Sequence, residues 1–336
     1  MPRRVFAPDE KVRVALVGAG GWGRQHARVL TAHSDVELCA VFGRTREKTQ
    51  ARAREFGIPR AYTDLAEMLD SEKPDFVSIS LPNERHFAPT LAVIEAGFPL
   101  LVEKPLVFDL AEADALVEAA EERGLFFAIN FNHRYAKPVV KARAAIEAGR
   151  LGRIVFATWR FGGEGGTGHP HANLIETQCH GFDMLEYLCG PVRSVMAEMT
   201  DVTDKGFTTL ALALRFESRA VGSFVGSYDS SYAYPGTHHV EVNGTDGHVL
   251  IEDTVRRFTF QSRGDETREV WEAGYFNDRD REFHRTFDAH MDALLSAFRA
   301  GEPPPISAEA GRRALRVAHA AIRSFETGTR VEVDGT

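Results

Sequence analysis

The first 130 residues alternate short apolar, β-rich runs with longer helix-like segments, and this alternation limits the fold more than any other feature. The apolar runs are VRVALVG, VELCAVF, DFVSISL, PLLVEK and LFFAIN, at 12–18, 36–42, 75–81, 99–104 and 125–130. The helix-like segments between them are 22–33, 45–56, 84–97 and 110–123. Strands that lack strict alternation and are separated by helices indicate a parallel sheet covered on both faces. We expect a doubly wound α/β domain over residues 1–130.

The sequence pattern changes in the rest of the chain, 131–336. After a helix-like segment at 138–149, runs such as GRIVFATWRF, FTTLALALRF and HVLIEDT follow one another with turn residues between them. This pattern is typical of an antiparallel sheet. Helix-like segments return at 279–300 and 307–326, separated by GEPPP, which no helix continues through. We expect a second α/β domain with a large, mainly antiparallel open sheet.

Composition excludes several classes of protein. The chain has 336 residues, of which 43% are hydrophobic, enough for two packed cores. A net charge of -8 without a Lys/Arg-rich run argues against a nucleic-acid partner. No apolar run approaches membrane-spanning length, and acidic residues stand where a signal peptide would have its apolar core. We expect a cytoplasmic protein without a membrane partner.

The three cysteines, Cys39, Cys179 and Cys189, form no C-x-x-C pair. An odd count without such a pair indicates neither a disulfide framework nor a cysteine zinc site.

A glycine-rich motif, Gly18-x-Gly20-x-x-Gly23, stands between the first apolar run and the first helix-like segment. The first glycine permits a tight turn, the second lets the backbone approach a pyrophosphate, and the third allows close packing of helix on strand. The start of the helix then faces the phosphates with unpaired N–H groups. A turn with no ligand is the alternative, but the strand-turn-helix context favours a dinucleotide, with Gly21 and Trp22 also in contact with it.

The residues after the second strand bear on the choice of dinucleotide. NAD-binding proteins usually place an acidic residue there, which binds the ribose 2′-hydroxyl. This chain has Arg44 and Thr45 instead, followed by Arg46. A guanidinium suits a 2′-phosphate, so NADP is preferred over NAD. The alternative is that these arginines are simply exposed residues at the start of a helix.

Three polar motifs each follow an expected strand and so reach the carboxyl edge of the sheet, where ligands bind. They are SLPNERH at 80–86, VEKPL at 102–106 and INFNHRY at 129–135. Together with GAGGWG, CHGFDMLEYLCG and AGEPPPISAEAGRRALRVAHAAIRSF, they resemble the Gfo/Idh/MocA family, the relatives of glucose-fructose oxidoreductase and inositol dehydrogenase. The resemblance covers nearly the whole chain.

The resemblance implies a Rossmann domain followed by an α/β domain whose open sheet carries the substrate pocket on one face. The other face often forms the oligomer contact, so we expect a homo-oligomer, a dimer or a tetramer. The implied reaction is hydride transfer between NAD(P) and a secondary alcohol or ketone. The implied substrate is a sugar, a glycoside or an inositol-like polyol.

The resemblance also assigns catalytic roles. Lys104, in E-K-P, matches the active-site lysine, and His180 matches the histidine that accepts the alcohol proton. Glu176 stands where the family usually has an aspartate, and Gln178 where a glycine is common; both are departures that put the direct role of Glu176 in doubt. Asp183 would orient the imidazole, or else cap the helix or form a pair. For His180 the alternative is a satisfied buried histidine.

Further residues complete the expected site. The expected cofactor contacts also include Pro82, Asn83, His86, Glu103 and Lys104. The expected substrate contacts are Lys104, Asn132, Arg134, Tyr135, Glu176 and His180. Tyr232, Tyr234 and His238 could reach the pocket from the sheet, and the glycine-rich segment 161–168 could cover it as a flap. His169 and His171 with Glu176 could be read as a metal site, but two histidines in a glycine-rich loop favour a site without metal.

Two other functions are compatible with the same residues. One is a glycoside hydrolase that retains its dinucleotide and oxidises its substrate transiently. The other is a non-catalytic dinucleotide-sensing regulator, and the joint presence of Lys104 and His180 argues against it.

Overall fold

The computed structural model describes residues 6–7, 9–165 and 168–333, and the chain divides into two compact units. The first unit comprises the residues up to Phe131 together with Phe287–Arg312. The second unit comprises Asn132–Thr286 and the residues from Arg313 onward. The boundary expected from the sequence places every residue from 131 onward in the second domain, whereas the structure packs Phe287–Arg312 with the first unit.

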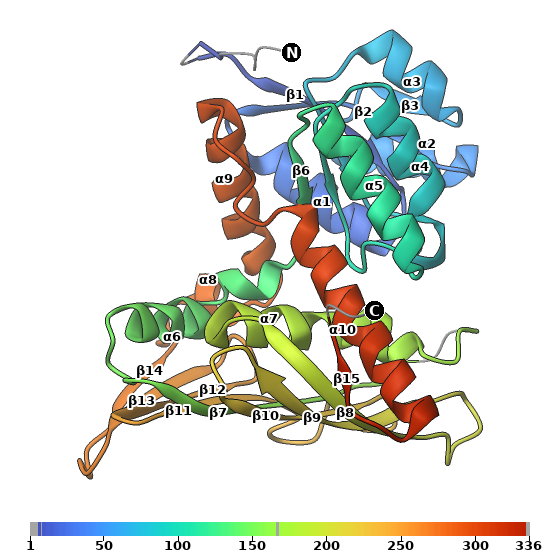
Figure 1. The fold of residues 1–336 in the computed structure, drawn as a ribbon. Coiled ribbons are helices and arrows are strands. Elements are labelled where there is room, and N and C mark those ends of the chain that lie inside the picture. Colours follow the sequence, from blue (N-terminus) through green and yellow to red (C-terminus); the bar gives the residue numbers. More distant parts are fainter. Residues whose placement is uncertain (1–5, 8, 166–167, 334–336) are drawn as a thin grey trace. The chain divides into compact units, whose positions relative to one another are not determined.

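The first unit is a parallel six-stranded sheet with the strand order β3-β2-β1-β4-β5-β6 (Figure 1). Its strands are β1 (Val12–Val17), β2 (Val36–Phe42), β3 (Arg60–Tyr62), β4 (Phe76–Ile79), β5 (Leu100–Val102) and β6 (Phe127–Ile129). Its helices are α1 (Gly21–Ala32), α2 (Arg46–Phe56), α3 (Leu65–Glu72), α4 (Phe87–Glu95) and α5 (Leu110–Glu122). The predicted doubly wound fold is confirmed, and the strand order changes direction between β1 and β4, where such sheets bind ligands.

One strand and one helix of this unit are absent from the sequence prediction. The strand β3 is three residues long, and Arg60 and Ala61 in it are exposed. The helix α3 follows directly, with the Asp64 carboxylate accepting the Glu67 N–H at its start. An edge strand this short and polar lacks the apolar run by which the other strands are found in a sequence.

The helix α9 (Arg285–Ala300) belongs with the first unit from Phe287 onward because its apolar side chains complete the core there. The Phe298 ring packs edge-on against Phe76 and Phe126, with ring centroids 5.2 and 5.4 Å apart. The Arg28 guanidinium pairs with the Asp288 carboxylate at 2.8 Å. The chain therefore returns to its first sheet after building the second.

The second unit is a nine-stranded sheet with the order β14-β13-β12-β11-β7-β10-β9-β8-β15. Its longer strands are β7 (Ile154–Gly162), β8 (Val192–Thr200), β9 (Thr209–Phe216), β10 (Val221–Ser227), β11 (His238–Gly244), β12 (Gly247–Glu252) and β13 (Arg257–Ser262). The short edge strands are β14 (Glu269–Glu272) and β15 (Val331–Glu332). Among the described strands of this second sheet, only β7 and β10 pair in parallel. The predicted, mainly antiparallel sheet is therefore confirmed.

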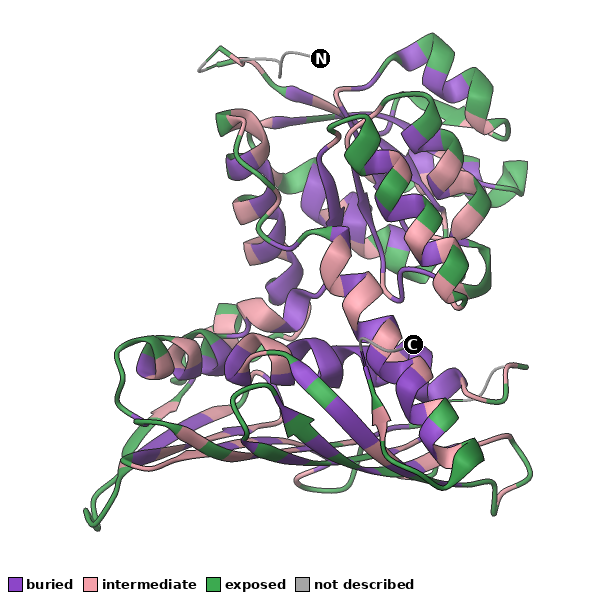
Figure 2. Ribbon diagram, in the orientation of Figure 1, coloured by how far each residue is buried: buried purple, intermediate pink, exposed green. Residues whose placement is uncertain are grey.

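Helices cover one face of this sheet and leave the other open. The helices α6 (Lys137–Glu147) and α7 (Cys179–Cys189) lie across the covered face (Figure 1), and α10 (Ala308–Thr327) adds its buried residues to this unit from Arg313 onward. A short helix, α8 (Asp278–Arg281), follows β14. Residues along β9 and β10 alternate between buried and exposed, as the bands on these strands show in Figure 2. This alternation is that of an antiparallel sheet with one packed face.

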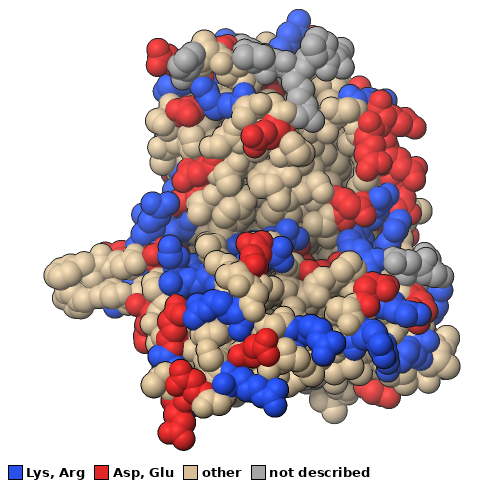
Figure 3. Space-filling view, turned by 60° about the vertical axis from the view of Figure 1, so that its left-hand side comes forward, with Lys and Arg blue, Asp and Glu red and all other residues tan. Residues whose placement is uncertain are grey.

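Charged side chains of both signs are interspersed on the face shown in Figure 3. Among the described residues, no helix is long and apolar enough to cross a membrane.

Gly181 lets α7 lie directly on the aromatic core of the second unit. A Cβ atom there would stand 2.5 Å from the Trp159 ring and 2.6 Å from the Phe224 ring. Both rings are fully buried, with 1% and 0% of their surface exposed, and neither can move aside.

We predict that Gly181→Ala lowers the free energy of unfolding by about 1–3 kcal/mol through overpacking, although alanine is the better helix former. Thermal melting followed by circular dichroism measures the loss. The matched control is Gly274→Ala, where a Cβ would meet nothing within 4 Å. An unchanged melting temperature for Gly181→Ala would contradict the packing described.

Candidate active site

The turn between β1 and α1 has no room for a side chain at Gly18 or Gly23. A Cβ on Gly18 would lie 1.9 Å from the Ser80 carbonyl oxygen, and a Cβ on Gly23 would lie 2.1 Å from the Gly18 carbonyl oxygen. Gly18 also has a φ of +128°, a backbone conformation that residues with a side chain rarely adopt. These two glycines bring the start of α1 against the end of β1.

The start of α1 is open to a ligand. Its N-cap residue, Gly20, offers no side chain to the first N–H groups, and a Cβ on Gly20 or Gly21 would meet nothing within 4 Å. Trp22 is 45% exposed, and its ring stacks on Phe287 with the centroids 5.6 Å apart. The turn therefore fits a pyrophosphate, which backbone N–H groups and a helix N-terminus bind well.

The residues after β2 leave Arg44 and Arg46 exposed. Thr45 is the N-cap residue of α2, without a side-chain hydrogen bond to the helix. A different arginine, Arg52, donates to the carbonyl oxygens of Ala19 and Gly20 at 3.2 and 3.3 Å. Arg52 thus holds the glycine turn, whereas Arg44 is exposed.

The loops after β4 and β5 are joined through a buried histidine. In these loops Asn83 begins a 3-10 turn, with Pro82 before it. The ring nitrogens of His86 lie 2.7 Å from the Pro105 carbonyl oxygen and 3.0 Å from the Leu81 carbonyl oxygen. Burial lowers the pKa of His86, against the opposing effect of these carbonyl groups. His86 therefore fixes the loop after E-K-P and has little ring surface left for a cofactor.

Glu103 is buried beside Lys104 at the end of β5. Only 4% of its surface is exposed, and its carboxylate accepts hydrogen bonds from His26 and Asn130, both at 2.7 Å. The backbone N–H of Lys104 donates to its other oxygen at 3.2 Å. Lys104 itself is half-buried.

In the second unit a π-helical turn, Asn173–Thr177, precedes α7 and carries Glu176, which is 7% exposed. Gln178, fully buried, accepts a hydrogen bond from the Trp159 indole N–H at 2.9 Å and donates to the Asn173 side chain at 3.0 Å. The glutamine that stands in place of a glycine therefore holds this turn against the sheet.

His180 lies in the first turn of α7 and stacks on another histidine. The rings of His180 and His133 are 3.8 Å apart and tilted by 4°, and both residues are buried. The Phe283 ring lies edge-on to the His133 ring, with the ring centroids 5.2 Å apart. The centroid of the His238 ring lies 5.8 Å from that of His133. The plane of the His180 imidazole is therefore fixed by packing.

Asp183 and Arg134 form a buried bidentate ion pair. The Arg134 guanidinium donates to the two carboxylate oxygens of Asp183 at 2.9 and 2.5 Å. Burial raises the pKa of Asp183, and the charge of Arg134 opposes that rise. The guanidinium also lies 4.6 Å from the centre of the Tyr187 ring. Arg134 and Asp183 therefore hold each other. The orienting role of Asp183 towards His180 and the substrate-binding role of Arg134 stay predictions.

The other expected residues differ in how far they are buried. Asn132 donates to the Thr286 hydroxyl at 2.6 Å, and burial raises the pKa of Tyr135 to about 12. Burial lowers the pKa of His238 to about 3. Tyr232 and Tyr234 are 61% and 60% exposed.

The expected flap, 161–168, lies only partly within the described residues, because 166–167 are outside them. Its described part is packed on tyrosines, since a Cβ on Gly163 would lie 2.7 Å from the Tyr232 hydroxyl oxygen. Among the described residues, no group of three or more His, Cys, Asp or Glu side chains could hold a metal ion.

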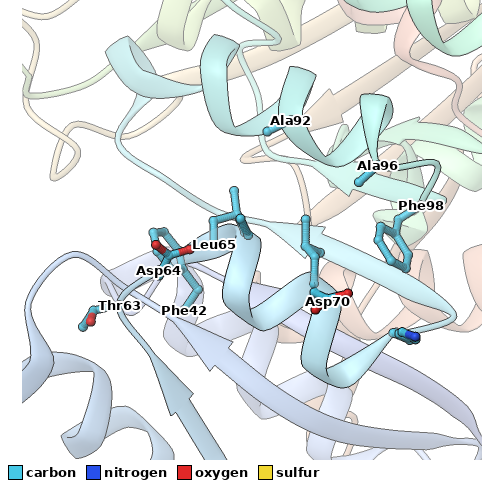
Figure 4. Close-up of a pocket in the computed structure, with 11 residues that line it drawn as sticks. Phe42, Thr63, Asp64, Leu65, Asp70, Ala92, Ala96 and Phe98 are labelled. Carbon is cyan, nitrogen blue, oxygen red and sulfur yellow. The ribbon is translucent and has the colours of Figure 1, made fainter.

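A pocket of about 760 Å³ lies between α3 and α4 in the first unit (Figure 4). Ala92 faces it from α4, Ala96 faces it from the C-cap position of that helix, and Phe98 lies at its edge. Its wall also contains Phe42, the last residue of β2, and Leu65. The described residues that line it include none of the expected site residues.

Comparison with known proteins agrees with both units. Residues 12–131 match the model of an oxidoreductase family with an NAD-binding Rossmann fold, and residues 143–333 match the model of that family's C-terminal α/β domain. The chain belongs to the Gfo/Idh/MocA oxidoreductase family. The predicted family is thereby confirmed, and the protein is an NAD(P)-dependent oxidoreductase of the sugar and inositol dehydrogenase class.

The relatives that it resembles differ in substrate and cofactor. It is 25% identical to a myo-inositol 2-dehydrogenase of Thermotoga maritima, over 96% of this chain and 99% of that protein. It is 26% identical to an NADP⁺-dependent D-xylose 1-dehydrogenase of Haloferax volcanii, over 95% of this chain and 99% of that protein. The structure of a levoglucosan dehydrogenase with NADH and levoglucosan has a similar fold, with a TM-score of 0.87 at 20% identity over 96% of this chain and 100% of that one.

Sequence reasoning missed several residues beside the expected site. His133 lies within the quoted motif INFNHRY, yet no pattern shows that its ring meets His180, 47 positions along the chain. His26 and His290 are missed for the same reason, since their partners lie far away in sequence. Long-range pairs of this kind appear only after folding.

We predict that Arg134→Met lowers the free energy of unfolding by roughly 3–5 kcal/mol, because it leaves the Asp183 carboxylate buried without a counter-ion. Adding Asp183→Leu to Arg134→Met should restore part of the loss. Urea unfolding measures both. Arg193→Met is the matched control, since Arg193 and its partner Glu332 are both more than half exposed, 55% and 56%. Additive losses in the double variant would contradict a coupled pair.

Proposed function

We propose that the protein is an NADP-preferring dehydrogenase or reductase that transfers a hydride between nicotinamide and a secondary alcohol or ketone of a sugar, glycoside or inositol-like polyol. The observation that supports it most directly is the glycine turn, which has no room for a side chain at Gly18 or Gly23 and leaves the start of α1 open to a pyrophosphate. The relatives named above act on polyols and sugars of this class.

The first unit would hold the dinucleotide through the backbone of Gly18–Gly23 and through Arg44 and Thr45. When bound, the nicotinamide supplies the acceptor or donor of the hydride. Arg44 is exposed at the end of β2 and can pair with a 2′-phosphate, which NADP has and NAD lacks.

His180 would act as the general base for alcohol oxidation and as the general acid for ketone reduction. An imidazole exchanges protons near neutral pH, and the fixed plane of this ring would aim one nitrogen at the substrate hydroxyl. We assign Lys104 to a hydrogen bond with the reacting oxygen, where an ammonium stabilises developing negative charge. Glu176 is buried one turn before His180 and would bind a neighbouring substrate hydroxyl.

We predict that His180→Ala lowers kcat by a factor of about 100 or more, because the proton then has no acceptor. The assay follows NADPH formation at 340 nm with a panel of myo-inositol, D-xylose and levoglucosan. The control is His33→Ala, since His33 is the C-cap residue of α1, at the end of the helix away from the glycine turn. Turnover of His180→Ala near the wild-type rate would overturn this assignment.

Arg44→Ala tests the cofactor preference. We expect the dissociation constant for NADPH to rise about tenfold, as one charge-assisted hydrogen bond is lost, with that for NADH almost unchanged. Fluorescence titration measures both constants. Arg54→Ala, an exposed arginine in the last turn of α2, should change neither. Equal losses for both cofactors in Arg44→Ala would contradict an NADP preference.

The same titration separates the proposal from its nearest alternative. A dinucleotide that exchanges freely fits a dehydrogenase that draws on a soluble pool. A dinucleotide that stays bound through purification fits a hydrolase that oxidises its substrate only transiently. We also propose that the protein works in the cytoplasm, where an exchangeable NADP pool is available.

We propose further that the open face of the nine-stranded sheet forms the contact of a homo-oligomer. On this face Val225 lies opposite Ala211 and Ser223 opposite Ala213, and Val221 is 50% exposed. Small side chains side by side on an open sheet face suit an interface between copies. Light scattering of the purified protein tests this, and a monomer at micromolar concentration would contradict it.

A further inference from the structure

Five buried polar side chains of the first unit, Glu103 among them, form one hydrogen-bonded cluster, and two of them contact the Glu103 carboxylate directly. His26 lies 2.7 Å from Glu103 on one side and 2.7 Å from the Ser78 hydroxyl on the other. Asn130 lies 2.7 Å from Glu103 and 2.7 Å from His290. The exposed fraction of each of the five is 4% or less. They come from α1, β4, α9 and the ends of β5 and β6.

The chemistry of these groups fixes the direction of most of the hydrogen bonds. An ionised carboxylate only accepts, so the Nε2 of His26 and the amide nitrogen of Asn130 both donate to the Oε1 of Glu103. The amide oxygen of Asn130 must then accept, so the Nδ1 of His290 donates to it. The cluster thus presents donors to a single buried negative charge.

This charge is maintained in the folded protein. Burial acts to raise the pKa of Glu103, but the hydrogen bond from His26, the charges of His26 and Lys104 and the hydrogen bond from Asn130 outweigh it and hold the pKa below its ordinary value. A buried carboxylate persists only when it is paired in this way. The cluster therefore keeps Glu103 ionised next to Lys104.

We propose that Glu103, held by His26 and Asn130, positions Lys104 for the reaction. The Oε2 of Glu103 accepts the backbone N–H of Lys104 at 3.2 Å, so the carboxylate fixes the backbone from which the ammonium projects. In this proposal Glu103 is a positioning residue that acts through Lys104. The inference rests on the proposed function of Lys104.

The return of the chain to the first unit supplies the last member of the cluster. His290 comes from α9, which follows the whole second unit in sequence, and it completes the set through Asn130. A first unit cut at residue 130 would lack this contact.

Three variants in the full-length protein test the proposal. Glu103→Gln keeps the shape and removes the charge. His26→Leu removes the donor to Glu103, and His26→Gln restores a donor of similar reach. The control for the charge is Glu121→Gln, on the exposed surface of α5.

The first readout needs no cofactor or substrate. The cofactor-free protein is treated with limiting acetic anhydride, and peptide mapping gives the acetylation rate of Lys104 relative to exposed Lys137. We expect this ratio to rise at least about threefold in Glu103→Gln and in His26→Leu, because Glu103 then no longer fixes the Lys104 backbone and the amine becomes more mobile. His26→Gln and Glu121→Gln should keep the wild-type ratio.

The second readout is turnover. With the polyol that the wild type oxidises fastest, kcat should fall about tenfold in Glu103→Gln and in His26→Leu, with the dissociation constant for NADPH within about threefold of wild type. The double variant should be no worse than Glu103→Gln alone, since His26 acts through Glu103. His26→Gln should recover most of the activity. If Glu103→Gln fails to fold, the two His26 variants carry the test.

The outcomes separate this proposal from the function on which it rests. If Lys104→Met is inactive while Glu103→Gln and His26→Leu keep wild-type kcat and acetylation ratios, the positioning role is wrong. If Lys104→Met keeps its turnover, the proposed function of Lys104 is wrong, whatever the acetylation rates show.

Discussion

The close approach of the β1–α1 turn to the end of β4 is the constraint on which the first unit depends. Gly18 lies so near the Ser80 carbonyl that a single added carbon would overlap it, and Gly23 is as close to Gly18. The N–H of Ser80 in turn donates to the Val17 carbonyl at 2.7 Å, which joins the two strand ends. The turn therefore presents backbone N–H groups where a parallel sheet binds its ligands.

Both units surround their catalytic candidates with buried polar contacts. In the first, Glu103 beside Lys104 is held by His26 and Asn130. In the second, His180 is held by a stacked imidazole and its helix by the network of Gln178. Buried polar groups of this kind are stable only when their partners are in place, so the Lys104 backbone and the His180 ring are fixed before any ligand binds.

The sequence was sufficient for the fold because the strands are apolar runs and the glycine turn has a defined spacing. It could not reveal β3, because the three residues of that strand form no apolar run. It could not reveal that α9 belongs to the first unit, because the contact of Phe298 with Phe76 joins residues far apart in the sequence. Motifs pointed to Lys104 and His180, but the neighbours that hold them, His26 and His133, come from long-range packing. The roles of Arg134 and Asp183 also depend on their pairing, which no spacing predicts.

Transfer of deuterium from nicotinamide to substrate tests the central claim most directly. The protein would be given NADPH deuterated at the transferable C4 position, together with the ketone of the polyol that it oxidises fastest, and the alcohol product analysed by mass spectrometry and NMR. Direct hydride transfer predicts one deuterium on the new carbinol carbon and none lost to solvent. Consumption of the ketone with all of the deuterium still on the dinucleotide would contradict this account and indicate transient oxidation or a different reaction.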